Sequence, residues 1–325
     1  MKRKTFLFFC LTLLFSLILL AGCNKARTTS SYSPPGKLYD LGGYKLHLQS
    51  QGSGSPTVIM EAGAGDCSLT WTLVAPVIAR TNRVCTYDRG GMGWSDVSPY
   101  PRLATIEVAE LHALLQKAGI KPPYVLVGHS LGGVLARVFT HTYSNEVVSL
   151  VLVDPSHEEQ MTRQEPAIQK SMSQATDRAQ VMLRGLADKA ARGKLTNADV
   201  NAIISPNLPT KEKAEYAFLL RTRSVFWQTV IAELKSLDAS FAGVKAEHIT
   251  SLGNIPLIVI SSSATPEIAG TQALSLKAVR VLRKLQQELS EESTRGVHIT
   301  AKGTTHFIQL VQPQTVINAI KRVLQ

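Results

Sequence analysis

The chain contains few cysteines: there are four in 325 residues, with Cys10 inside an N-terminal apolar run and Cys23 at its end. Only Cys67 and Cys85 remain for the folded body, which excludes a scaffold held by many disulfides. None of the four has the spacing of a metal motif, and we expect no metal and no cofactor. Cys67 and Cys85 either pair in an oxidising compartment or, the interpretation we favour, are two small buried apolar side chains.

The chain also lacks a basic stripe. Its net charge is +11, but the positive side chains are scattered, as Arg178, Arg184 and Lys189 are, and aromatic residues make up only 6%. Surfaces that bind nucleic acid combine clustered Lys and Arg with aromatic side chains, so we expect no nucleic acid as a partner. Attraction to an anionic membrane surface is only weakly indicated.

Neither compositional disorder nor an internal repeat is visible. Hydrophobic residues make up 44% of the sequence, which is enough for a sizeable core. The length fits one large α/β domain with an insertion, or two domains.

The N-terminus has the pattern of a secretory signal. Positive residues 2–4 precede an apolar run, Phe6–Leu20, that is shorter than the roughly 20 residues of a membrane span. The tetrapeptide Leu-Ala-Gly-Cys that ends at Cys23 resembles the bacterial lipoprotein signal, which implies a lipid on the Cys23 thiol. We therefore predict a signal peptide (1–22), a flexible tether (23–36) and an extracytoplasmic body anchored to a bacterial membrane. The alternative is a signal anchor that stays in the membrane.

The segment that organises the chain is Gly128-His129-Ser130-Leu131-Gly132. An apolar run typical of a buried strand, Tyr124–Val127, precedes it, and a helical pattern, Val134–Phe139, follows. A G-x-S-x-G motif between strand and helix is typical of a nucleophile elbow, in which the glycines avoid clashes at a sharp turn. Because a helix N-terminus favours a developing anion, Ser130 is the candidate nucleophile. The alternative is a glycine-rich turn with a coincidental serine.

On this motif the sequence resembles the α/β-hydrolase family, from about Lys37 to the C-terminus. The resemblance implies a mostly parallel sheet with helices on both faces and a helical cap insertion. The run Tyr87–Asp96 is similar to the family's Y-D-R-x-G-x-G-x-S loop, which implies a structural rather than catalytic role for Asp88 and Arg89 as a pair. A predicted hairpin around Gly42-Gly43 carries His47, which we interpret as a solvated strand residue.

The resemblance also implies an oxyanion hole made of two backbone N–H groups. One is that of Leu131, after the nucleophile, and the other comes from the loop after the strand Thr57–Glu61. Here that loop reads Ala62-Gly63-Ala64, so the second donor is expected at Ala64. The family commonly has histidine where this chain has Ala62.

A base and an acid should follow the serine in the chain. His306 lies just past the last predicted strand and before the final helix, where the family places its base. The acid usually follows the strand that is Ile255–Ile260 here, where Glu267 is the carboxylate in reach. In some members it follows the strand after the elbow helix, and Asp154 lies there. We prefer Asp154 and keep Glu267 as the runner-up.

The domain prediction is a core in two parts, 37–157 and 254–325, with a helical cap at 158–253. The cap segment has helical periodicity and no strand-like apolar run, and its main helices are expected at Met161–Arg192 and Lys211–Leu237. A cap excludes water and shapes the acyl pocket. Four apolar cap residues either line that pocket or, the favoured interpretation, form the cap's own core: Phe218, Leu219, Phe226 and Trp227.

Together these features predict a membrane-tethered serine hydrolase. Serine at the elbow excludes family members that use aspartate there, such as epoxide hydrolases. A small carboxylic ester or acyl substrate is expected, and an acyltransferase or peptidase would use the same residues. The alternative from another class is a non-catalytic binding protein on the same fold.

Overall fold

The computed structural model describes residues 32–264 and 272–325. The predicted signal peptide, Cys23, most of the predicted tether and the runner-up acid Glu267 lie outside the described residues. No helix within the described ranges is long and apolar enough to cross a membrane.

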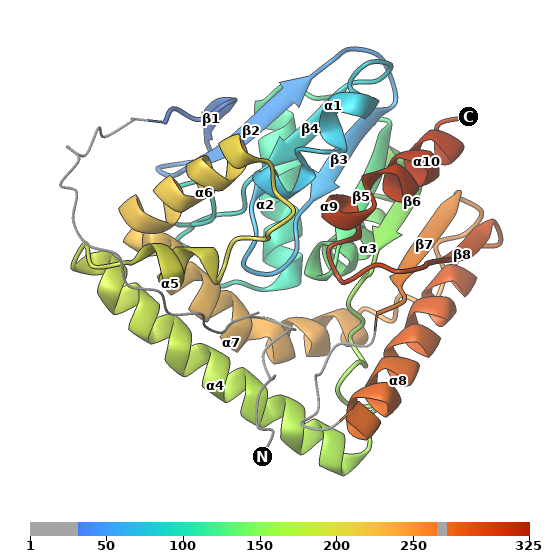
Figure 1. Cartoon of the computed structure of the whole chain (residues 1–325). Helices are drawn as coiled ribbons and strands as arrows, with labels where there is room; N and C mark the ends of the chain where they lie inside the picture. Colours follow the sequence, from blue (N-terminus) through green and yellow to red (C-terminus); the bar gives the residue numbers. More distant parts are fainter. Residues whose placement is uncertain (1–31, 265–271) are drawn as a thin grey trace.

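An eight-stranded sheet runs through the molecule in the order β1-β2-β4-β3-β5-β6-β7-β8 (Figure 1). The pairs β1–β2 and β2–β4 are antiparallel and every other neighbouring pair is parallel. The mostly parallel α/β class predicted from the sequence is therefore confirmed. The strands are β1 (Lys37–Asp40), β2 (Lys45–Gln51), β3 (Thr57–Glu61), β4 (Val84–Tyr87), β5 (Tyr124–His129), β6 (Val147–Val153), β7 (Leu257–Ser262) and β8 (Gly296–Ala301).

Helices cover both faces of the sheet because successive strand residues point to opposite sides. In β5, Leu126 packs into the cluster beneath α2, α3 and α8, whereas Val125 and Val127 pack into the cluster beneath α1, α9 and α10. Burial on both faces explains why the central strands are continuously apolar. The covering helices are α1 (Ala75–Ile78), α2 (Ala104–Lys117), α3 (Leu131–Thr142), α8 (Gln272–Glu291), α9 (Ile308–Val311) and α10 (Pro313–Val323).

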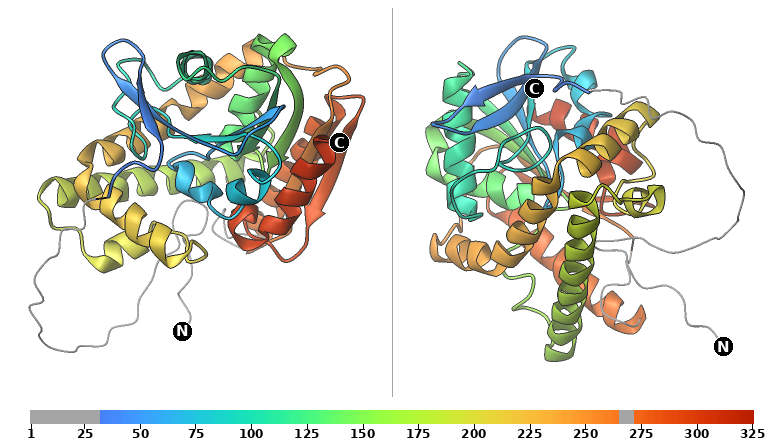
Figure 2. Two further views of the ribbon diagram at one scale, coloured as in Figure 1. Left: turned by 90° about the horizontal axis from the view of Figure 1, so that it is seen from above. Right: turned by 90° about the vertical axis from the view of Figure 1, so that its left-hand side faces the viewer.

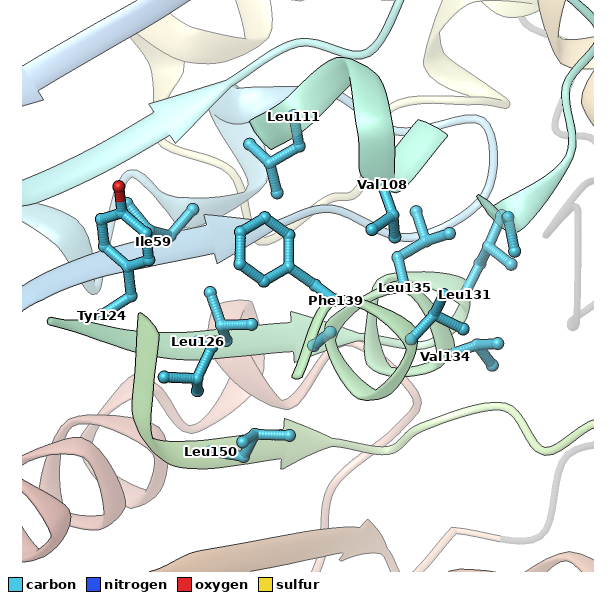
Figure 3. Packing of buried hydrophobic residues seen from close by; sticks show 14 of the residues in the cluster. Ile59, Val108, Leu111, Tyr124, Leu126, Leu131, Val134, Leu135, Phe139 and Leu150 are labelled. Atoms are coloured by element: carbon cyan, nitrogen blue, oxygen red, sulfur yellow. The ribbon is translucent and has the colours of Figure 1, made fainter. Parts of the chain in front are cut away.

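The packing of α3 is the part of the core that positions the elbow. Figure 3 shows Phe139 of α3 between Leu111 of α2 and Leu126 of β5, and all three side chains are buried. Each such side chain contributes about 1.5–3 kcal/mol by leaving water. The N-terminus of α3 is thereby held at the carboxyl end of β5.

Between β6 and β7 the chain is helical, as expected for the cap. The helices are α4 (Pro166–Ala191), α5 (Asn197–Asn201), α6 (Thr210–Thr222) and α7 (Ser224–Ala246), grouped together outside the sheet (Figures 1 and 2). The exact core and cap boundaries stay a prediction.

The single helix predicted at 211–237 is wrong. It is two helices that meet at Arg223, whose φ of −113° and ψ of 84° are not helical. The Arg223 guanidinium donates to the backbone oxygens of Trp94 and Ser95, at 3.3 and 2.6 Å. Because this contact is with a loop distant in sequence, the local hydrophobic pattern around Arg223 does not indicate the break.

The apolar cap residues form a buried cluster with the β3 and β4 loops. Leu219, Phe226 and Trp227 are at most 1% exposed, and the same cluster contains Met92 and Trp94 from the loop after β4. The interpretation as a core made by the cap alone is therefore corrected, because the cluster is shared between the cap and the loops of the sheet. Phe218 is half-buried and its ring packs against Tyr32 and Trp94.

Cys67 and Cys85 are both free and buried. The interpretation as two small apolar side chains is confirmed, and the alternative of a disulfide between them is wrong.

Candidate active site

Ser130 joins β5 to α3 in a backbone conformation that serine rarely adopts, with φ 54° and ψ −119°. Such strain persists only where the surroundings enforce it. A Cβ at Gly128 would overlap the Gly132 carbonyl, and a Cβ at Gly132 would lie 2.5 Å from the Glu61 oxygen. Both glycines of the motif are therefore required by close backbone approach, as the sequence predicted.

His306 lies in the loop between β8 and α9, and this loop packs against the elbow. His129, the residue before Ser130, donates from Nε2 to the backbone oxygen of His306 at 3.0 Å. The two imidazole rings are 4.5 Å apart between centroids. The structure thus places His306, the predicted base, against His129, the residue next to the predicted nucleophile, although the two histidines are 177 positions apart in sequence.

Asp154 follows β6 directly, with a left-handed φ of 42°. Its Oδ2 accepts a hydrogen bond from His306 Nδ1 at 2.7 Å. Ser262, at the end of β7, donates its backbone N–H to Oδ1 at 2.9 Å and its hydroxyl to Oδ2 at 3.0 Å. Gln286 of α8 donates to Oδ1 at 3.2 Å. Both oxygens of this buried carboxylate are consequently satisfied.

The electrostatics of the site favour an ionised Asp154. Burial alone would raise the pKa of its carboxyl, but the hydrogen bond and charge of His306, with the donors of Ser262, outweigh burial and hold the pKa below 3.8. Burial, and then the nearby His306, lower the pKa of His129 to about 3, so His129 is neutral. His129 therefore does not compete with His306 for a proton at neutral pH.

The two predicted oxyanion donors lie on the segments that flank Ser130. Leu131 is the first residue of α3. Ala64 lies in the loop after β3, where a Cβ on the adjacent Gly63 would be 3.3 Å from the Cβ of Ser130. The loop and the elbow are therefore in contact, as an oxyanion hole requires.

The sequence did not reveal Ser156 or Gln286. The Ser156 hydroxyl is 3.5 Å from that of Ser130, and its N–H donates to the Ser130 carbonyl at 3.0 Å. A pocket beside His306 is lined by Asp154, Ser156 and Gln286. In the sequence, the only signal for Ser156 is its position in the turn after Asp154. No local sequence feature distinguishes Gln286 from the other residues of α8.

Asp88 and Arg89 are structural, but they are not a pair with each other, which corrects the sequence prediction. Asp88 bonds to His47 Nδ1 at 2.8 Å, and both side chains are fully buried. His47 is therefore not a solvated strand residue. Arg89 instead pairs with Glu61 at 2.7 Å and Glu233 at 3.0 Å. The two residues directly follow β4 and have separate partners.

Across the residues that the structure describes, no group of three or more His, Cys, Asp or Glu side chains could hold a metal ion.

The family model for the alpha/beta hydrolase fold matches residues 56–222, more than half of the chain, and the chain belongs to this family. The match includes β3, β5, the elbow, β6 and part of the cap. The chain is therefore a protein with the α/β-hydrolase fold.

Similarity to some curated relatives extends over most of the chain. "Probable transporter efuK" of Hormonema carpetanum is 28% identical over 315 residues, which covers 91% of this chain and 43% of that protein. The chain spans less than half the length of the first two curated relatives that it matches.

Solved structures show the same fold at low identity. Est816, described as an N-acyl homoserine lactone degrading enzyme, is 17% identical with a TM-score of 0.61, and 88% of this chain and 99% of that chain are covered. The epoxide hydrolase CorEH is 18% identical with a TM-score of 0.60, covering 88% of this chain and 97% of that one. These likenesses establish the architecture alone.

The lowered pKa of Asp154 makes a prediction about stability and pH. Ionised Asp154 stabilises the folded state at pH values above its unfolded pKa of about 4, and this stabilisation is lost as pH falls through the folded pKa. Asp154→Asn should therefore be less stable than the wild type at pH 7, and the difference should shrink below about pH 4. Urea unfolding from pH 3 to 8 measures this, and a difference that grows toward low pH would contradict it.

Proposed function

We propose that this chain is a serine hydrolase that cleaves carboxylic esters through an acyl-enzyme on Ser130. The observation that carries the proposal is the 2.7 Å bond from His306 to the buried Asp154, in a loop that packs on the Ser130 elbow. A serine hydroxyl becomes a useful nucleophile only when a positioned base takes its proton.

The bond to Asp154 sets the tautomer of His306. Because Nδ1–H donates to the carboxylate, Nε2 is left as the basic nitrogen. In the proposed mechanism, Nε2 removes the Ser130 proton as Oγ attacks the ester carbonyl. The N–H groups of Leu131 and Ala64 stabilise the oxyanion.

Collapse of this tetrahedral intermediate breaks the bond to the alcohol, which receives the proton from His306 and leaves. Water, deprotonated by the same imidazole, then attacks the acyl-enzyme and releases the carboxylic acid. Both half-reactions balance without a redox partner or cofactor.

The membership in the α/β-hydrolase family supports hydrolase chemistry, and the elbow residue narrows the reaction. An aspartate nucleophile would form an alkyl-enzyme ester, whereas Ser130 forms an acyl-enzyme. Est816 is described as degrading an N-acyl homoserine lactone, a molecule that contains both a cyclic ester and an amide, so ester and amide substrates should be compared.

Labelling with a fluorophosphonate tests the nucleophile. The wild type should form one adduct on Ser130 and hydrolyse p-nitrophenyl esters of graded chain length. Ser130→Ala should form no adduct and lose about 10⁴-fold or more in kcat, whereas Ser144→Ala, outside the site in the segment between α3 and β6, should behave as wild type.

Equal labelling of Ser130→Ala, or no labelling of the native protein, would instead favour a non-catalytic binding protein. Product analysis with added alcohols and peptides separates the remaining options. An alcohol that outcompetes water as acyl acceptor would make the chain an acyltransferase, and preferred cleavage of peptides would make it a peptidase.

The identity of the acid can be tested by moving it. Ser262 ends β7, the strand that carries the acid in most of the family, and its hydroxyl lies 3.0 Å from Asp154 Oδ2. Asp154→Asn should lower kcat by about 10⁴-fold, since the imidazole then adopts the wrong tautomer. Adding Ser262→Asp to Asp154→Asn should restore at least about 10-fold of this loss, because a carboxylate returns to the same imidazole edge.

Glu267→Gln is the matched comparison and should keep near-wild-type kcat, with Ser262→Asp alone as the control for the new charge. A loss in Glu267→Gln that exceeds the loss in Asp154→Asn would make Glu267 the acid.

We also propose that Cys23 carries a lipid that tethers the protein to the outside of a bacterial membrane. The support is the charged and apolar N-terminal pattern that ends in Leu-Ala-Gly-Cys. Expression in bacteria with an alkyne analogue of palmitate should label the wild type, and the label should be found with the membranes. Cys23→Ser should be unlabelled, and persistent label on this variant would contradict the proposal.

A further inference from the structure

The loop that carries Ala64 is held from the core by one buried guanidinium. Arg89, at the end of β4, donates from Nη1 to the Ala62 oxygen at 2.7 Å and from Nη2 to the Gly63 oxygen at 2.6 Å. Arg89 is 3% exposed. Two successive carbonyls of the loop are therefore fixed on one side by a single planar group.

The same loop is held from the other side by the cap. Glu233 of α7 accepts the Gly65 N–H through Oε2 at 2.6 Å, and it is only 2% exposed. Tyr216 of α6 donates its hydroxyl to the Gly65 carbonyl at 3.3 Å. Both polar groups of the Gly65 backbone are thus bound by cap side chains.

The two supports are bonded to each other. Arg89 Nε donates to Glu233 Oε1 at 3.0 Å, and Glu61 accepts from Arg89 Nη1 at 2.7 Å. Burial alone would lower the pKa of Arg89, but the carboxylates of Glu233 and Glu61 raise it well above its usual value, so the guanidinium stays charged. Core and cap therefore meet at this buried ion pair.

Peptide geometry transmits these contacts to the proposed oxyanion donor. In a planar trans peptide, the N–H of one residue points opposite to the C=O of the residue before it. Arg89, by binding the Gly63 carbonyl, therefore sets the direction of the Ala64 N–H. Glu233, by binding the Gly65 N–H, sets the orientation of the next peptide plane, between Ala64 and Gly65.

We propose that Glu233 is a positioning residue for the oxyanion hole, acting with Arg89 to hold the Ala62–Gly65 loop from the cap. The inference rests on the proposed function, because it assigns a role to the loop that carries Ala64. It also means that the cap must be docked for the oxyanion hole to be in place.

Glu107 of α2 provides a matched control. It belongs to the same buried group of charges, is 4% exposed, and pairs with Arg102 at 2.5 Å. Its nearest approach to Arg89 is 3.8 Å. Burial raises the pKa of Glu107 to about 7. Glu107→Gln therefore changes an equally buried carboxyl group near Arg89 that makes no contact with the Ala62–Gly65 loop among the hydrogen bonds described above.

The test compares Glu233→Gln with Glu107→Gln on p-nitrophenyl ester hydrolysis. Gly65 and Arg89 donate to different oxygens of Glu233, so a glutamine in the same position would turn its NH2 group, which cannot accept, toward one of them. Glu233→Gln should lower kcat by about 100-fold with KM changed less than about 3-fold, since the oxyanion forms after substrate binds. Inhibition by a trifluoromethyl ketone, whose adduct carries an oxyanion, should weaken in parallel.

Glu107→Gln should have a kcat within about 3-fold of the wild-type value. Thermal unfolding of both variants shows whether a loss of kcat comes from a less stable fold or from a misplaced loop. Should Glu233→Gln fail to fold, Tyr216→Phe removes only the hydroxyl at the Gly65 carbonyl and should lower kcat by about 3- to 10-fold with KM unchanged.

Two results would overturn the inference while leaving the proposed function intact. The first is a wild-type kcat in Glu233→Gln or, if that variant does not fold, in Tyr216→Phe. The second is an equal loss of kcat in Glu233→Gln and Glu107→Gln. Failure of the proposed function has a different signature, because the wild type itself would then neither hydrolyse esters nor react with the fluorophosphonate.

Discussion

The hydrogen bond between Asp154 and His306 is the contact on which the arrangement of the site depends. It joins the end of β6 to the loop after β8, across 152 positions of sequence. Because β5, β6, β7 and β8 are successive neighbours in the sheet, their carboxyl ends meet at one edge. The elbow, Asp154, Ser262 and the His306 loop are therefore adjacent as a consequence of strand order.

Buried charges attach the cap to the core. Arg137 of α3 is completely buried and bonds at 2.7 Å to Glu158, the first residue of the predicted cap, and at 2.5 Å to Glu292 of the core. Arg89 and Glu233 make a second such junction beneath the loop that carries Ala64. Buried ion pairs often add little net stability over apolar packing, but removing one partner costs about 3–5 kcal/mol. These pairs therefore specify where the cap sits more than they stabilise the fold.

Much of the fold and part of the candidate site could be predicted from local patterns. The limits of β3 are as predicted, because an apolar run between turn residues is decided by its own sequence. Gly128 likewise avoids a clash with Gly132, four positions along the chain, whereas Gly132 avoids a clash with Glu61, which is distant in sequence. His306 was identified by its place in the chain order, which the family preserves. The helix break at Arg223 was missed, because it depends on a loop more than a hundred positions away.

The sequence by itself determined the strand–elbow–helix unit, the apolar faces of the sheet and the helical character of the insertion, since each depends on residues that are neighbours along the chain. Only the tertiary structure decided which carboxylate meets His306, that His47 is buried against Asp88, and that Arg89 is bonded to a cap glutamate. These contacts join segments separated by 41 to 152 positions. The order of strands and the docking of the cap bring such partners together, and no local pattern of polar and apolar residues encodes that order.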